Sequence, residues 1–330
     1  MTLKGGAAVK VFSVGKNDAG QRLDRFVAKT IPLLPASLLQ KSLRLKRIKL
    51  NGRPAKRDAR VAEGDAVQAY LADEFFEQPR EENAYLKVAT PSLNILYEDD
   101  NILLADKRPG VAVHPHDGAE YGKTLIDQIQ AYLYQKGEWR PRESGSFTPA
   151  LCNRIDRNTG GIVIAAKTAQ ALRILNEKIR TRELDKRYLC ITLGTPRPAE
   201  GELIRYLVKD EKHNLVRVYR KPVSGGKTAV TRYRVLRSGG KLSLTEVELE
   251  TGRTHQIRAC FADAGFPLLG DGKYGRGEQN RAYGETRQCL YAYKLRFAFQ
   301  TDAGALQYLD GKTFRVQDVP FAEKYFGGTP

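Results

Sequence analysis

Four strand-like segments follow one another between residues 201 and 249, and the connections between them are too short to hold a helix. The last two, residues 227–236 and 241–249, alternate polar and apolar side chains and are joined through Ser238, Gly239 and Gly240. Such a connection favours a hairpin, so we expect these two strands to pair antiparallel. Helices are few elsewhere and do not alternate regularly with strands. The sequence therefore predicts an α+β fold with a mostly antiparallel mixed sheet flanked by helices and loops.

Turn and cap signals outside this run of strands locate further elements. Asp99-Asp100-Asn101 separates two apolar runs and predicts a hairpin. Thr124 and Thr168 each precede an apolar repeat with helical spacing and are expected N-caps. Thr254 is the expected cap of a shorter helix. A last long strand is expected at residues 289–299.

The first part of the chain is predicted to be a separate small α/β unit. Residues 1–20 form a lead-in, and residues 21–72 combine a helical repeat, a second helix rich in Lys and Arg, and an Asn51-Gly52 hairpin turn. Most of the net charge of +17 lies within residues 1–72. Residues 73–90 are rich in acidic side chains, so we expect a linker that leads to a larger unit at 91–330.

The net charge of +17 predicts a polyanionic partner but leaves RNA, DNA, anionic membrane and heparin open. The four cysteines lack Cys-x-x-Cys spacing, so free thiols in a reducing compartment are favoured over a zinc site. Because the sequence has no signal peptide and no apolar run of membrane length, we expect a cytoplasmic protein without membrane contact. His114 and His116 flank a proline with no third ligand nearby, and no metal is expected there.

One short stretch, residues 153–161, has the composition of a reactive loop. Asp156 lies between Arg154 and Arg157, and an Asn-Thr-Gly-Gly turn then leads into an apolar strand. We expect Asp156 on a loop at a strand edge, with its carboxylate ionised by the flanking positive charge. An ionised carboxylate there can attack carbon, balance a cation or cap a turn. On residue type alone, a structural ion pair is the more common case.

Residues 20–72 resemble the alpha-L RNA-binding module, first named in a small-subunit ribosomal protein. The resemblance is carried by three segments, residues 21–27, 48–52 and 61–67, together with the basic helix between the first two. It implies binding to structured RNA, which we expect to consist mostly of phosphate contacts with little reading of sequence. The side chains expected to contact RNA are Arg22, Arg25, Lys41, Arg44, Lys46, Arg47 and Lys49.

Residues 93–325 resemble an RluA-type pseudouridine synthase. Five ordered motifs carry this resemblance: residues 110–115, 153–161, 186–188, 252–258 and 265–275. The chain differs from the usual family pattern at Asn153, where the family has His, and at Gly160, where it has Ser. These differences leave the carboxylate, the tyrosine and the arginine of the motifs in place.

The resemblance implies a site without metal or cofactor. There the bond between the anomeric carbon of uridine and its ring nitrogen breaks, and the base rejoins the sugar through ring carbon 5. Asp156 would be the nucleophile and would attack either the base or the sugar, a choice that the sequence leaves open. Arg258 would pair with Asp156, and Tyr188 would stack on the uracil. Only one carboxylate stands in a motif, which favours isomerisation over hydrolysis by a pair of carboxyl groups.

The resemblance also implies substrate contacts around these three catalytic residues. The target base must be flipped out of the RNA, and Arg154 could fill the gap that it leaves. Ile257 would pack against the ring. The side chains expected to bind substrate are Arg154, Arg253, His255, Gln256 and Ile257.

Taken together, these resemblances predict a monomeric enzyme that converts uridine to pseudouridine in structured RNA. Large-subunit ribosomal RNA is the favoured substrate, and tRNA is possible. One alternative is a catalytically silent RNA-binding or ribosome-assembly protein. A weaker alternative is a nucleoside glycosidase, which would release free uracil.

Overall fold

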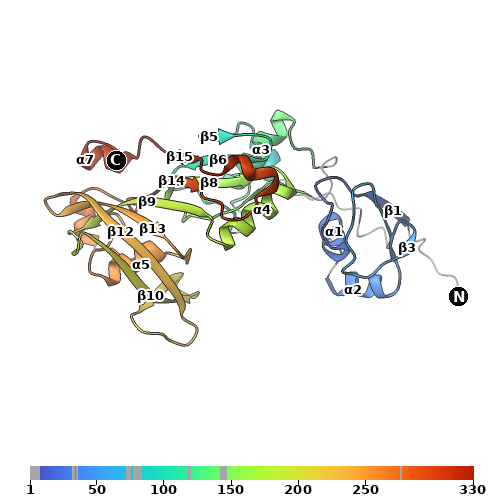
Figure 1. Cartoon of the computed structure of the whole chain (residues 1–330), viewed down its shortest axis with the longest axis horizontal. Coiled ribbons are helices and arrows are strands. Elements are labelled where there is room, and N and C mark those ends of the chain that lie inside the picture. The colour runs from blue at the N-terminus through green and yellow to red at the C-terminus, as the bar shows by residue number, and fades with distance from the viewer. Residues whose placement is uncertain are drawn as a thin grey trace.

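The computed structural model describes residues 8–31, 34, 36–71, 76, 84–116, 120–141, 147–275 and 277–330, and it contains a four-stranded and an eleven-stranded sheet (Figure 1). The small sheet has the strand order β1-β4-β2-β3. The large sheet runs β11-β10-β12-β13-β9-β14-β8-β6-β5, with β15 paired to β14 and β7 paired to β8. Figure 1 shows the N-terminal unit, in blue, set apart from the body that holds the large sheet.

The N-terminal unit packs two helices against its small sheet. Its elements are β1 (Ala8–Ser13), α1 (Leu23–Thr30), α2 (Ala36–Arg44), β2 (Ile48–Leu50), β3 (Arg53–Pro54) and β4 (Ala66–Leu71). The predicted hairpin at Asn51-Gly52 is confirmed, because Leu50 pairs with Arg53 and both turn residues have positive φ, 51° and 77°. Leu23 and Phe26 of α1 bury against Ile48 and Val67, so this unit has a hydrophobic core of its own.

The large sheet confirms the predicted mostly antiparallel mixed architecture. Its strands are β5 (Ile95–Glu98), β6 (Ile102–Lys107), β7 (Ala150–Leu151), β8 (Gly160–Ala166), β9 (Leu184–Leu193), β10 (Glu200–Asp210), β11 (Leu215–Tyr219), β12 (Lys227–Gly239), β13 (Leu242–Leu249), β14 (Leu290–Phe297) and β15 (Thr313–Arg315). β12 and β13 form the predicted hairpin, and β14 is the predicted last long strand. β14 pairs with β8 in parallel. The flanking pairs, β14 with β9 and β8 with β6, are antiparallel.

Helices cover parts of this sheet and bear on three cap predictions. They are η2 (Ala84–Lys87), α3 (Leu125–Lys136), α4 (Ala169–Arg180), α5 (Gln256–Asp263), α6 (Gly277–Ala282), η4 (Gly304–Leu309) and α7 (Pro320–Phe326). Thr124 caps α3 in a capping box with Asp127, and the side chain of Thr168 accepts from a backbone N–H of α4, so both predictions are confirmed. The prediction for Thr254 is wrong: α5 begins one residue later than expected, and His255 takes the N-cap position with φ of 51°.

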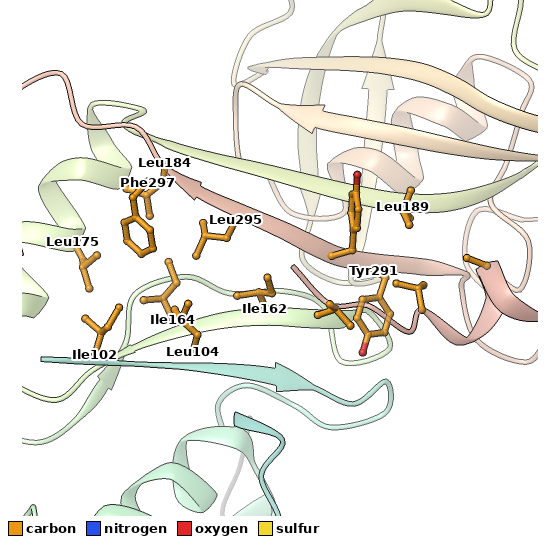
Figure 2. Close-up of a cluster of buried hydrophobic side chains, with 14 of the residues drawn as sticks. Ile102, Leu104, Ile162, Ile164, Leu175, Leu184, Leu189, Tyr291, Leu295 and Phe297 are labelled. Carbon is orange, nitrogen blue, oxygen red and sulfur yellow. The ribbon is translucent and has the colours of Figure 1, made fainter. Parts of the chain in front are cut away.

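The hydrophobic core lies on both faces of the large sheet, because successive residues of a strand point to opposite sides. Ile102 and Leu104 of β6 belong to one cluster, which Figure 2 shows together with side chains from β8, α4, β9 and β14. Leu103, between them, belongs to the cluster on the other face. That second cluster reaches the motif residues Ile155, Tyr188 and Ile257, so the apolar core supports the candidate site directly.

The segment expected to be a linker lies partly within the described residues. Residues 72–75 and 77–83 lie outside them. At its C-terminal end, Tyr85 of η2 packs edge-on against Trp139, with ring centroids 4.9 Å apart, and belongs to the same buried cluster as Val88 and Leu133. This end of the segment therefore lies against the larger unit.

Candidate active site

Asp156 lies on the loop before β8, as the sequence predicted, and it lines a cavity of about 860 Å³. The residue before it, Ile155, is buried in the apolar cluster, and the backbone N–H of Thr159 donates to the carbonyl of Asp156 at 3.0 Å. Asn153 holds the other end of the loop, since its side-chain oxygen accepts from the backbone N–H of Ile164 at 2.8 Å. The carboxylate is therefore displayed by a loop that is fixed at both ends.

Lys107 also holds the loop that carries Asp156. Its side chain is buried, and Nζ donates to the carbonyl oxygens of Arg108, Val111 and Arg157 at 3.1, 2.8 and 2.9 Å. Burial lowers the pKa of Lys107 to about 7, although the carboxylate of Asp156 opposes that shift. One amino group thus ties the turn after β6 to the residue that follows Asp156.

Arg258, on α5, connects Asp156 to a second carboxylate. Its Nη1 donates to Oδ2 of Asp156 at 2.8 Å, and its Nε and Nη2 donate to the two oxygens of Asp271 at 2.7 and 2.9 Å. Burial disfavours the charged guanidinium, but the two carboxylates outweigh burial and raise the pKa of Arg258. The guanidinium therefore keeps its positive charge while it bonds to both carboxylates.

Tyr188, on β9, forms part of the apolar wall of the cavity. Its ring clusters with Ile155, Ile257 and Leu290, and all four side chains are at least nine-tenths buried. Burial, and to a lesser degree the charge on Asp156, raises the pKa of Tyr188, so the phenol is neutral. An apolar wall beside a carboxylate suits a flat heterocycle whose reacting edge faces the acid.

His255 lies between Asp156 and a second tyrosine. Its Nε2 is 3.9 Å from Oδ2 of Asp156, and its Nδ1 is 2.9 Å from the hydroxyl of Tyr274. Tyr274 also lies over the guanidinium of Arg258, with the ring centroid 5.3 Å from Cζ. His255, Arg258 and Tyr274 thus form a connected group around one face of the carboxylate.

The other residues expected to bind substrate also line the cavity, but in different ways. Arg154 is exposed, and its guanidinium forms no bond with another described residue. Arg253 is exposed and donates from Nε to the carbonyl of Thr228 at 3.1 Å. Gln256 is buried, and its amide is bonded to Thr251, Arg253, Val230 and Thr231.

The basic side chains expected to contact RNA lie in the N-terminal unit, mostly on α2 and the turn after it. Most of them are exposed, namely Arg25, Lys41, Arg44, Lys46 and Arg47. Arg22 is half-buried and forms a bidentate pair with Asp24, at 3.0 and 2.7 Å. Lys49 is half-buried, with Nζ 4.9 Å from the centre of the Tyr70 ring.

The sequence analysis missed three residues that hold the site together: Lys107, Asp271 and Tyr274. Asp271 and Tyr274 belong to a motif that carried the resemblance, but nothing in the sequence indicated which side chains they contact. Lys107 lies three residues before the first motif and looks like a surface lysine in the sequence. A buried amino group bonded to three carbonyls leaves no local pattern in the sequence.

Over the part of the chain that the structure describes, no three His, Cys, Asp or Glu side chains come together as a metal site would require. Within the same residues, no helix is both long enough and apolar enough to cross a membrane. All four cysteines are free thiols, as predicted.

Comparisons with known sequences agree with the resemblance. The family model described as RNA pseudouridylate synthase matches residues 101–263. The chain is 31% identical over 296 residues to ribosomal large subunit pseudouridine synthase C of Vibrio vulnificus, which covers 88% of each chain. It is 34% identical over 292 residues to an uncharacterized RNA pseudouridine synthase of Mycoplasma genitalium, covering 87% of this chain and 88% of that one.

Comparison with solved structures supports the same fold. Human RNA pseudouridylate synthase domain containing 4 superposes with a TM-score of 0.54 at 22% identity, over 69% of this chain and 89% of that one. Since these two sequence relatives, 34% and 31% identical, match 87% and 88% of the chain, the protein belongs to the RNA pseudouridylate synthase family, an isomerase family that acts on uridine in RNA, and to its RluA-type branch.

Proposed function

We propose that this enzyme converts specific uridines of large-subunit ribosomal RNA to pseudouridine, with Asp156 as its nucleophile. The observation that carries the proposal is the Asp156 carboxylate, which opens onto the cavity and is held by Arg258 at 2.8 Å. The choice of ribosomal RNA rests on relatives named for the large ribosomal subunit. A flipped-out uridine would enter the cavity with its base against the apolar wall.

In the proposed reaction, Asp156 forms a covalent bond with the extruded nucleotide, while the bond between the anomeric carbon and ring nitrogen breaks. The base then turns over and ring carbon 5 bonds to the anomeric carbon, while the bond to Asp156 breaks and the carboxylate is released. Ring carbon 5 loses its proton and ring nitrogen 1 gains one, so product and substrate have the same composition. Arg258, bonded to Oδ2 of Asp156 at 2.8 Å, keeps the carboxylate aimed at the reacting carbon. Whether that carbon belongs to the base or to the sugar stays open. No redox agent or phosphate donor is needed for this exchange.

The remaining side chains take supporting roles in the proposal. Tyr188 stacks on uracil. Its hydroxyl, which has no bond to another described residue, lies near the site of proton transfer. Ile257 packs against the ring, and Arg154 fills the gap left in the RNA. The amide of Gln256 is already bonded to four protein groups, so we propose that it shapes the loop before α5. Arg253 and His255 are then the residues of this segment that contact the substrate directly.

We also propose that residues 21–72 act as an alpha-L RNA-binding module, joined by residues 73–90 to a catalytic domain at 91–330. The support is the group of exposed basic side chains on α2 and the turn that follows it. The three proposed catalytic side chains come from one chain, so we propose that a monomer suffices, and that it works in the cytoplasm on ribosomal RNA.

The test is to map pseudouridine by carbodiimide adducts in total RNA from cells that express the wild type, Asp156→Asn, or no protein. Asp156→Asn keeps the size of the side chain but removes the charge, and we expect it to abolish the modification. Asp100→Asn, which changes an exposed acid on the turn between β5 and β6, is the matched control and should leave the modification intact. Equal modification by wild type and Asp156→Asn would reject the proposal and favour a silent RNA-binding protein.

A further inference from the structure

The hydroxyl of Tyr274 bridges the backbone of β11 and the ring of His255. The backbone N–H of Val216 donates to this oxygen at 2.8 Å, and Nδ1 of His255 lies 2.9 Å from it. Because Val216 supplies a proton to the oxygen, the proton on the tyrosine hydroxyl is free to point at Nδ1. Among the described residues, Nδ1 is the one acceptor that this hydroxyl meets.

This arrangement favours one tautomer of the imidazole, the one in which Nδ1 accepts from the tyrosine hydroxyl. A ring nitrogen that accepts a hydrogen bond carries no proton, so the proton of neutral His255 is on Nε2. Burial lowers the pKa of His255, which keeps the ring neutral at physiological pH although Asp156 opposes the shift. The backbone holds the ring in place through a left-handed conformation at φ 51°, which is uncommon for a residue other than glycine.

The protonated Nε2 faces Asp156 without binding it. The distance to Oδ2 is 3.9 Å, which is too long for a hydrogen bond. Both residues line the cavity, and an oxygen atom at an ordinary distance of about 2.8 Å from each of the two atoms would bridge them. That oxygen must accept a proton from Nε2 and donate one to the carboxylate.

We propose that this position binds the 2′-hydroxyl of the target nucleotide, an inference that rests on the proposed function. A carbonyl oxygen of uracil only accepts, and its ring N–H only donates, whereas a hydroxyl does both. The 3′ and 5′ oxygens of a nucleotide within a chain are esterified, so the 2′-hydroxyl is the free hydroxyl of the ribose. His255 then distinguishes RNA from DNA at the reacting nucleotide, and Tyr274 is a positioning residue that fixes the tautomer.

The first test reads the tautomer without any substrate. Long-range proton–nitrogen correlation spectra of the ¹⁵N-labelled protein report which ring nitrogen carries the proton for each of the four histidines. The signals of His255 are assigned by their loss in His255→Asn, and the exposed His213 is an internal control. We expect the Nε2–H form in the wild type and a mixture of forms in Tyr274→Phe. A wild-type Nδ1–H form would overturn the inference.

The second test compares synthetic hairpins that carry the mapped uridine of ribosomal RNA, either as uridine or as 2′-deoxyuridine. We expect the missing hydroxyl to lower kcat/KM at least about tenfold for the wild type and for His213→Asn, but only about twofold for His255→Asn. Asparagine tolerates the left-handed backbone, but its side chain is too short to reach the hydroxyl. Tyr274→Phe should show an intermediate penalty.

The two proposals fail in different ways. A merely structural role for His255 would lower the rates on both hairpins equally, and an equal penalty in the wild type and His255→Asn would overturn the inference. A wild-type enzyme that leaves the uridine hairpin unmodified would instead reject the proposed function, and the tautomer would still be decided by the spectra.

Discussion

The guanidinium of Arg258 and the carboxylate of Asp156 are joined by a hydrogen bond of 2.8 Å, although 102 positions separate them in the chain. The opposite edge of the same guanidinium is bound to Asp271 at 2.7 and 2.9 Å. Asp271 is buried, whereas Asp156 is partly exposed to the cavity. One planar cation thus joins a buried carboxylate, which orients it, to the carboxylate proposed to react.

Arg258→Lys should nearly abolish activity while leaving the protein folded. A lysine ammonium lacks the planar fork that binds both carboxylates at once, so Asp156 would lose its fixed direction. We expect pseudouridine formation to fall by at least about 100-fold, the effect that a small misplacement of a reacting group can have. Carbodiimide mapping measures the loss, and circular dichroism checks the fold. Arg180→Lys, on the exposed face of α4, is the control and should keep full activity.

Asp271→Asn should reduce both stability and activity. Removing one partner of a buried ion pair costs about 3–5 kcal/mol, so the free energy of unfolding in urea at pH 7 should drop by about that amount. Burial raises the pKa of Asp271, but hydrogen bonds from Arg258 and two backbone N–H groups outweigh it and hold the pKa below its usual range.

The difference in stability between wild type and Asp271→Asn should depend on pH, because the pKa of Asp271 is lowered in the folded protein. A carboxyl whose folded pKa is lowered stabilises the fold above its unfolded pKa, about 3.9, and that contribution is lost as the pH falls through the folded value. The gap in stability between wild type and Asp271→Asn should therefore be full at pH 7 and shrink below about pH 4. A gap that stayed constant into acid would show that the ionised carboxylate is not its cause.

The sequence predicted most of the fold and the place of Asp156, but not what holds the site. The hairpins and two helix caps were predictable because turn and cap residues act within a few positions of one another. The cap of α5 was mispredicted because Gln256 closes the preceding loop with its own side chain, and His255 takes a left-handed conformation for which no local signal exists. The contact between Arg258 and Asp271 depends on how the helix meets a distant loop, which no spacing encodes.

Lys107→Met should loosen the loop that carries Asp156. The substitution keeps the length of the side chain but leaves three carbonyl oxygens without the donor that they share. We expect the free energy of unfolding to fall by about 2 kcal/mol or more, together with a clear loss of activity. Urea unfolding and carbodiimide mapping measure the two effects. Lys87→Met, which removes an exposed lysine of η2, should change neither, and a stable, fully active Lys107→Met would exclude the supporting role.

Replacing Lys41, Arg44 and Arg47 together by Gln should weaken RNA binding and make the affinity less dependent on salt concentration. All three side chains are exposed in the N-terminal unit, remote in sequence from the cavity. For every phosphate that the protein no longer neutralises, the slope of log K against log salt should become shallower by about 0.7–0.9. Filter binding to ribosomal RNA over a salt series measures this slope. An unchanged slope and affinity at low salt would exclude this surface from RNA binding.

Gly160→Ser, which restores the residue usual in the family, should destabilise this protein because Tyr291 occupies the space. A Cβ atom at position 160 would lie 2.3 Å from the ring of Tyr291, whose hydroxyl is fixed to Asp106 at 2.7 Å. Overpacking of this kind costs about 1–3 kcal/mol, and the cost should be smaller in the background of Tyr291→Leu, where the ring is gone. Gly272→Ser, at a site where a Cβ meets no atom within 4 Å, is the control for unfolding in urea. If Gly160→Ser cost the same in both backgrounds, the ring would not be what keeps glycine at this position.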